Sequence, residues 1–170
     1  MQYPKTRLKK SDLLWLLAYP LYQIIGTMRH EASHGLVAWL GGATMTRFVF
    51  WPTVDQQRGF RWGYVQWSGP TNGLTLAVPY LADLLTFGLF FWLCMRISFP
   101  RRWLWLNAVI IGLVSPLANT AYNYLGSVWG ANDISRLLLI LPPLAVHAYL
   151  VLTIVLYGIG LWMVFKCTPR

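Results

Sequence analysis

The sequence predicts a mainly α-helical, polytopic integral membrane protein with about four transmembrane helices and a β-hairpin after the first. Two observations predict this fold. Only 11% of the 170 residues are charged and 56% are hydrophobic, whereas an average soluble domain carries about 25% charged residues. The apolar residues also fall in runs close to the roughly 20 residues that cross a bilayer. The sequence shows no internal repeat and no segment with the composition of a soluble second domain, so residues 1–170 are expected to form a single membrane-embedded domain.

The expected spans cover about 12–42, 71–95, 103–119 and 143–165. The first begins at Ser11-Asp12 and continues past Pro20, because a proline can kink a membrane helix without ending it. Gly41-Gly42 ends it.

Residues 44–68 differ in character from the apolar runs and predict a β-hairpin at the membrane surface. Their β-branched and aromatic residues flank the turn-prone segment Pro52 to Gly59. The third span is expected to bend at Pro116. Residues 119–133 are polar and contain glycine, so we interpret them as a loop that precedes a short helix from Ile134.

The net charge of +9 is distributed as in a membrane protein. Positive residues mark the cytoplasmic ends of spans, which favours a lipid bilayer over nucleic acid as the partner. Both termini and the 96–102 connection are therefore expected to be cytoplasmic in a multi-pass chain. Arg47, Arg58 and Arg61 run against this orientation, because they lie in the segment assigned to the opposite side.

The motif that carries chemistry is His30-Glu31-Ala32-Ser33-His34, in the distal half of the first helix. Two histidines four residues apart on a helix share one face, so both imidazoles can reach one metal ion. The intervening glutamate can act as the general base of a zinc protease. The alternative interpretation is a polar packing network, or an ion pair with Arg29, but ionisable groups within a span are costly and favour a functional role.

A catalytic zinc usually has three protein ligands, so a third ligand is expected elsewhere. One soluble protease class places a His at what is position 40 here, which is Leu, and another uses a second Glu, whereas Glu31 is the only Glu in the chain. The candidates that remain are Asp133, Asp83 and His147. We favour Asp133, interpret Asp83 as a hydrogen-bond partner of a metal-bound His, and interpret His147 as a packed or hydrogen-bonded core residue. Asp12 is expected at the helix start and Asp55 in the solvated hairpin turn.

These residues resemble the site-2 protease family of intramembrane zinc metallopeptidases. The resemblance covers roughly residues 28–140 and includes the His30 to His34 motif, Gly41-Gly42, the hairpin, Ser68-Gly69-Pro70 and Asn132-Asp133. It implies that His30, His34 and Asp133 hold one Zn²⁺ and that Glu31 is the catalytic base. This chain differs from the family pattern in the Ile134 that follows Asp133 and in the spacing of Gly69-Pro70-Thr71-Asn72, so Asn72 receives no catalytic role. Asn119 and Asn123 are alternatives for stabilising an oxyanion, and each also suits a loop or a helix cap.

The expected function is that of a membrane-embedded zinc endopeptidase, which hydrolyses peptide bonds in or near transmembrane segments of membrane-protein substrates. The hairpin could bind an unwound substrate as an added strand or anchor the chain at the lipid interface through its tryptophans. A homo-oligomer or a regulatory partner could close the site. The rival functions are a non-catalytic membrane scaffold or regulator of the same fold, and a metal or proton transporter, although transporters commonly contain repeats.

Overall fold

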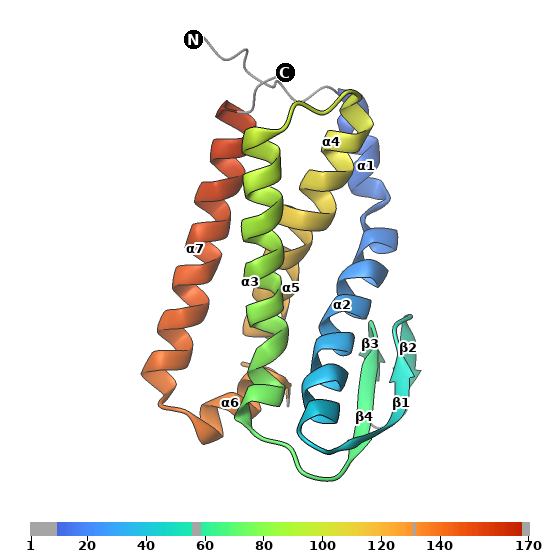
Figure 1. Cartoon of the computed structure of the whole chain (residues 1–170), viewed down its shortest axis with the longest axis vertical. Coiled ribbons are helices and arrows are strands. Elements are labelled where there is room, and N and C mark those ends of the chain that lie inside the picture. The colour runs from blue at the N-terminus through green and yellow to red at the C-terminus, as the bar shows by residue number, and fades with distance from the viewer. Residues whose placement is uncertain (1–9, 56–58, 131, 168–170) are drawn as a thin grey trace.

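The computed structural model describes residues 10–55, 59–130 and 132–167, and in these ranges the chain is mainly helical with two small antiparallel sheets beside one end of the bundle (Figure 1). The elements in chain order are a 3-10 turn (Lys10–Asp12), α1 (Leu13–Leu17), α2 (Tyr19–Leu40), β1 (Thr44–Val49), β2 (Thr53–Asp55), β3 (Gly59–Arg61), β4 (Tyr64–Ser68), α3 (Gly73–Arg96), α4 (Arg102–Val109), a π-helical segment (Ile110–Val114), α5 (Ser115–Gly126), α6 (Asp133–Ile140) and α7 (Pro143–Cys167).

Three helical stretches in the described part of the chain are long and apolar enough to cross a membrane: Gly73–Arg96, Arg102–Gly126 and Pro143–Lys166. They correspond to the last three predicted spans. The first predicted span, 12–42, is not among them. It is divided into α1 and α2, with Pro20 in the first turn of α2, and the polar motif residues lower the hydropathy of α2. A mainly helical fold with a small antiparallel sheet is confirmed.

The long helix Arg102–Gly126 extends further than the span 103–119 that the sequence predicted. Its last part, α5, continues to Gly126, so Asn119 and Asn123 lie inside a helix and not in a loop or at a cap. These polar residues suggested a loop, but they face polar partners in the interior of the bundle. A π-helical segment precedes Pro116, where the sequence predicted a bend. Proline lacks the N–H that would continue a regular hydrogen-bond ladder.

The hairpin predicted at 44–68 is present. Strands β1 and β4 pair antiparallel from Thr44–Ser68 to Val49–Tyr64, and β2 pairs with β3 inside the segment that was expected to be only a turn. Gly63, between β3 and β4, allows the hairpin to pass close to α2. A Cβ at this position would lie 2.5 Å from the Val49 carbonyl oxygen and 2.6 Å from the Thr27 methyl carbon, so a larger residue would force the sheet away from the helix.

Two hydrophobic clusters hold the helices together. The first joins α3, α7 and the helix from α4 to α5 around Phe87, Leu113 and Tyr157. The second joins α3, α6 and α7, and it includes Ile134, whose side chain is fully buried. Burial of Ile134 fixes the start of α6 against the bundle. The preceding loop is thereby held opposite α2.

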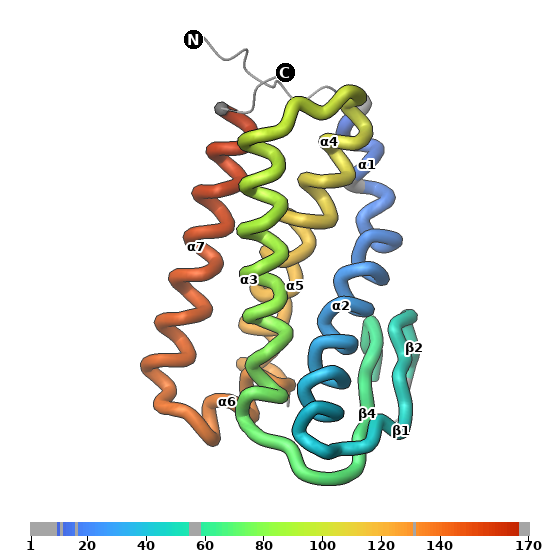
Figure 2. The backbone as a smooth tube through the Cα atoms, viewed as in Figure 1, coloured from blue at the N-terminus to red at the C-terminus, as the bar shows by residue number. Residues whose placement is uncertain are grey.

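The two ends of the molecule differ. The start of α1, the connection between α3 and α4 and the end of α7 lie at one end, whereas the C-terminal end of α2, the hairpin and α6 lie at the other (Figures 1 and 2). At the first end Arg102 forms an ion pair with Asp12, which is buried. The motif histidines therefore lie in the half of the molecule that carries the hairpin and α6.

Candidate metal centre

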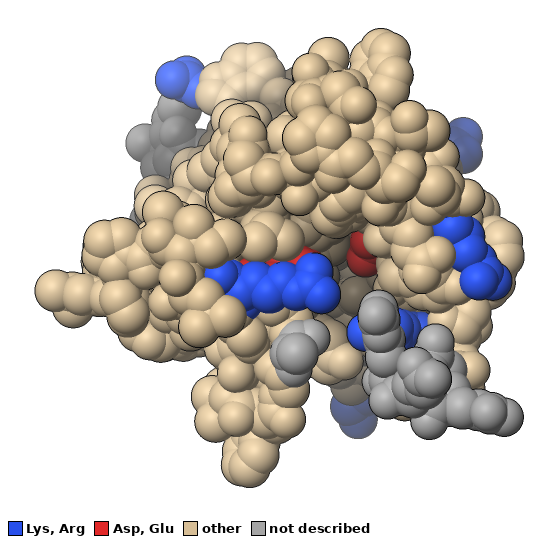
Figure 3. Space-filling model, turned by 90° about the horizontal axis from the view of Figure 1, so that it is seen from below, with Lys and Arg blue, Asp and Glu red and all other residues tan. Residues whose placement is uncertain are grey.

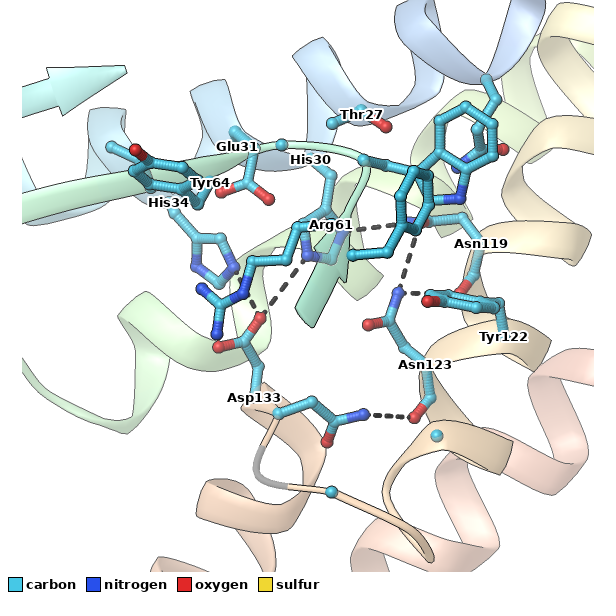
Figure 4. A pocket seen from close by; sticks show the side chains of 18 of the residues that line it. Thr27, His30, Glu31, His34, Arg61, Tyr64, Asn119, Tyr122, Asn123 and Asp133 are labelled. Carbon is cyan, nitrogen blue, oxygen red and sulfur yellow. Dashed lines mark hydrogen bonds and ion pairs between the residues drawn. The ribbon is translucent and has the colours of Figure 1, made fainter. Parts of the chain in front are cut away.

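Helix α2 presents both motif histidines to the interior of the bundle. His30 and His34 are 5% and 2% exposed, and their ring centroids lie 5.0 Å apart. This is the arrangement expected for two residues one helical turn apart. Glu31 is only partly buried, and its side chain points into the same cavity from the edge of the histidine face (Figure 4).

Asp133 reaches this pair from α6. Its Oδ2 atom lies 3.0 Å from His34 Nε2 and 3.6 Å from His30 Nε2. The start of α6 is held by a capping box, in which the Asn132 side chain accepts from the Ser135 backbone N–H and Ser135 bonds back to Asn132. Such a cap satisfies the free backbone groups of the first turn. The ligand atoms of His30, His34 and Asp133 all lie within 4.8 Å of one another.

The hydrogen bond on the far side of His34 determines which of its nitrogens faces Asp133. His34 Nδ1 lies 2.6 Å from the backbone carbonyl oxygen of Thr75. A carbonyl oxygen can only accept, so Nδ1 must donate its proton there, and Nε2 of the neutral ring presents a lone pair to the Asp133 carboxylate. Two acceptors 3.0 Å apart repel each other unless a proton or a metal cation lies between them. A metal ion between His34 Nε2 and Asp133, or a proton on that nitrogen, would satisfy both groups.

The donor set fits a divalent transition metal. Two imidazole nitrogens and one carboxylate oxygen are the ligands of several catalytic zinc sites, and ligands roughly 2.0–2.1 Å from zinc at tetrahedral angles are separated by about 3.3 Å. The two His–Asp separations bracket this value. Burial would raise the pKa of Asp133, but the positive charge and the N–H donors of the His30 and His34 rings, when these are protonated, outweigh it and hold that pKa well below its usual range. The carboxylate is thus available as an anionic ligand.

A buried polar network supports His30 from behind. Asn119 Nδ2 lies 3.0 Å from His30 Nδ1 and donates to Asp83 Oδ2 at 2.6 Å. The other Asp83 oxygen accepts from Arg29 at 3.0 and 2.6 Å. Asp83 is completely buried. The sequence suggested Asp83 either as a ligand or as a direct partner of a histidine, but it acts on His30 only through Asn119, and Arg29 pairs with Asp83 and not with the motif.

Other candidates lie away from the cluster. His147 is exposed on α7 and its Nδ1 lies 3.0 Å from the Tyr124 hydroxyl, so its expected place in the core is wrong, although its hydrogen bond is confirmed. Asn72 caps α3 by accepting from the Thr75 N–H. Asn123 donates to the Asn119 backbone carbonyl. The side chain of Asp55 lies outside the described part of the structure.

The histidines and Asp133 line a pocket with a volume of about 360 Å³ between α2, α5, α6 and the hairpin. Strand β4 contributes Tyr64, Val65 and Trp67, and α5 contributes Asn119, Tyr122 and Asn123. Viewed toward this end of the molecule, acidic side chains lie in a hollow flanked by basic ones (Figure 3).

Sequence reasoning missed the Thr75 carbonyl and the role of Asn119. A backbone carbonyl has no sequence signal, and Asn119 was considered only as an oxyanion donor, a loop residue or a cap. A polar residue flanked by apolar ones in a long run would have been the available signal. Comparison of the chain with protein families, with curated proteins and with solved structures found no match to any of them.

Proposed function

We propose that this chain is a membrane-embedded zinc endopeptidase of the site-2 protease type, which cleaves peptide bonds in or near transmembrane segments of other membrane proteins. One observation carries the proposal. The two motif histidines and Asp133, which lies 99 residues after His34, converge on one point, and the motif glutamate faces the same pocket. A proton could satisfy the His34–Asp133 contact in a packing network, so the proposal rests on the convergence of all three ligand atoms.

The proposed chemistry assigns one role to each side chain. His30, His34 and Asp133 would hold the metal, which supplies a Lewis acid that polarises the scissile carbonyl and makes water more acidic. Glu31 takes a proton from the attacking water as its oxygen bonds to the carbonyl carbon. Glu31 then delivers that proton to the leaving nitrogen as the C–N bond breaks. Thr75 orients the ring of His34 by accepting from its Nδ1–H, as partners of metal-bound histidines do. Metal on Nε2 of His30 would require the Asn119 amide to turn its oxygen toward His30 Nδ1.

The proposed setting is a membrane crossed by α2, α3, the helix from α4 to α5, and α7. Three of these have the length and hydropathy for a span, and α2 is shielded by them on its polar face, where its histidines are buried. Arg96, Arg101 and Lys166 lie at the end opposite the hairpin. This distribution supports a cytoplasmic location for that end and for both termini.

Strand β4 offers a means of holding the substrate. It pairs only with β1 among the described strands, and its residues Tyr64, Val65 and Trp67 line the pocket. An unwound substrate segment could add to the edge of β4 that faces the pocket, where the Val65 backbone bonds to Glu31, and place its main chain beside that glutamate. Unwinding is required because the peptide bonds of an intact helix are enclosed by their side chains and their own hydrogen bonds.

The test combines metal content with cleavage. The purified full chain in detergent should carry one tightly bound zinc, which His34→Ala and Asp133→Ala should each lose, whereas the control His147→Ala should retain it. Glu31→Gln should retain zinc but cleave captured substrates about 10²–10⁴-fold more slowly, the usual contribution of a general base. Zinc that survives both ligand substitutions, or unchanged cleavage by Glu31→Gln, would refute the proposal. Several weakly bound, exchangeable ions would indicate a transporter instead.

A further inference from the structure

Two arginines in the pocket have no partner that the structure describes. Arg61, the last residue of β3, and Arg136, in the first turns of α6, both line the cavity that contains the histidine–aspartate cluster. Neither guanidinium forms an ion pair or a hydrogen bond with any described residue. Arg29 and Arg102, by contrast, are each paired with an aspartate. No ion pair within the described fold therefore accounts for half-buried Arg61 or for exposed Arg136.

The position of these arginines also conflicts with the charge rule that orients the rest of the chain. Positive residues concentrate on the cytoplasmic side of membrane proteins, yet Arg61 and Arg136 lie at the end that carries the hairpin and α6. Figure 4 shows the Arg61 side chain directed from the hairpin into the pocket, on the side of His34 and Asp133. An arginine at the end that the charge rule disfavours, with its side chain directed into a pocket, indicates a ligand of opposite charge.

The net charge of the groups that line the pocket supports the same conclusion. Among the residues that the structure describes, the carboxylates that line it are Glu31 and Asp133, and a bound divalent metal, as proposed above, would neutralise both. The two arginines then leave the pocket with an uncompensated positive charge. Field lines from such a charge are focused in a cleft with low-dielectric walls.

We propose that Arg61 and Arg136 select substrates that carry carboxylate side chains beside the scissile bond, on the part of the substrate that lies at the hairpin end of the pocket. This inference rests on the proposed function, because it takes the pocket to be the substrate site and the metal to be bound. Arginine suits the task, since its planar guanidinium bonds a carboxylate through two parallel N–H groups. An acidic flank would also fix the direction in which the substrate enters.

Binding of synthetic peptides tests the proposal without relying on turnover. The full chain with Glu31→Gln, in nanodiscs of neutral phosphatidylcholine with zinc added, is titrated with peptides that share one apolar segment. Their two flanking residues are both Asp, both Asn or both Lys. Each partly exposed ion pair is expected to strengthen binding about threefold. The Asp peptide should then bind about tenfold more tightly than the Asn peptide, and the Lys peptide more weakly than both.

The variants Arg61→Gln and Arg136→Gln should each remove part of this preference, and the double variant should remove all of it. Arg96→Gln is the matched control, because Arg96 is exposed at the opposite end of α3. The preference should also shrink as salt is added, since exposed charges are screened. A circular-dichroism spectrum and a thermal unfolding curve show whether each variant is folded.

Three results would overturn the inference: equal binding of all peptides, no binding of any peptide, or an Asp preference that survives the double variant. A fourth would assign the arginines to lipid headgroups, namely loss of the preference in neutral nanodiscs combined with arginine-dependent binding of anionic phosphatidylglycerol. The proposed function is tested separately by cleavage of the same peptides by the parent chain. Charge-selective binding without zinc-dependent cleavage would refute the peptidase and retain the acidic-ligand site, whereas cleavage without charge preference would do the reverse.

Discussion

Asn119→Leu should weaken both the fold and metal binding, because one amide connects two buried groups. Asn119 Nδ2 lies 2.6 Å from Asp83 Oδ2 and 3.0 Å from His30 Nδ1, and leucine of similar size can bond to neither. A buried polar group that loses its partner costs about 1–3 kcal/mol. Two such groups, with Asp83 still bonded to Arg29, predict a loss of about 2–4 kcal/mol in the free energy of unfolding, of which leucine's better helix propensity recovers a few tenths.

The same substitution removes the group that orients His30. Loss of a partner of a metal-bound histidine typically lowers metal affinity about 10–100-fold. Zinc affinity is measured by competition with a chelator of known strength, and stability by denaturant unfolding in detergent micelles. Asn107→Leu is the control. Asn107 lies on the same long helix and accepts a hydrogen bond from Tyr22 of α2, but it is far from the motif. Its loss should cost about 1 kcal/mol and leave zinc affinity unchanged.

If Asn119→Leu binds zinc as tightly as the parent and unfolds at the same denaturant concentration, the coupling of Asp83 to His30 through Asn119 is refuted. If stability falls but zinc affinity is unaffected, the network is structural only. If Asn107→Leu lowers zinc affinity equally, the effect arises from general loosening of the bundle. The three outcomes can be told apart because each variant is measured for both properties.

Asp83→Ala should destabilise the fold by about 3 kcal/mol, because it leaves Arg29 without its buried partner. Replacing both residues by apolar ones should restore most of this stability in denaturant unfolding. If the losses of the two single substitutions simply add in the double variant, the pairing of Asp83 with Arg29 does not contribute as expected. Gly112→Ala should cost about 1–3 kcal/mol, since a Cβ there would collide with the Phe90 side chain, whereas at Gly88 a Cβ meets nothing within 4 Å. If Gly112→Ala and Gly88→Ala unfold at the same temperature, the contact between α3 and the π-helical segment accommodates the added Cβ without measurable cost.

The hairpin and the last span were predictable because their signals are local. Turn residues between β-branched and aromatic segments specify a hairpin, and the run after Pro142 has the length and composition of a span. The end of the third long helix was not predictable in this way. Asn119 and Asn123 carry a local preference for loops, and only the polar partners inside the bundle make a helix favourable there.

The residues of the candidate site also differ in whether a local signal could predict them. His30, Glu31 and His34 share one helix, so the 3.6-residue repeat of that helix alone determines that both imidazoles can face one ion. Asp133 was the favoured one of three candidates, but its approach to the histidines depends on the burial of Ile134, which brings the start of α6 to α2.

The sequence by itself determined the apolar class of the chain and the spacing of the motif, because composition and helical periodicity act over a few residues. The sequence favoured Asp133 but left Asp83 and His147 open, and tertiary structure decided among them. Tertiary structure alone decided which carbonyl sets the tautomer of His34 and that Arg61 and Arg136 share a pocket with the motif. These groups come from elements far apart in the chain. Their distances depend on how the helices and the hairpin pack, which no local preference specifies.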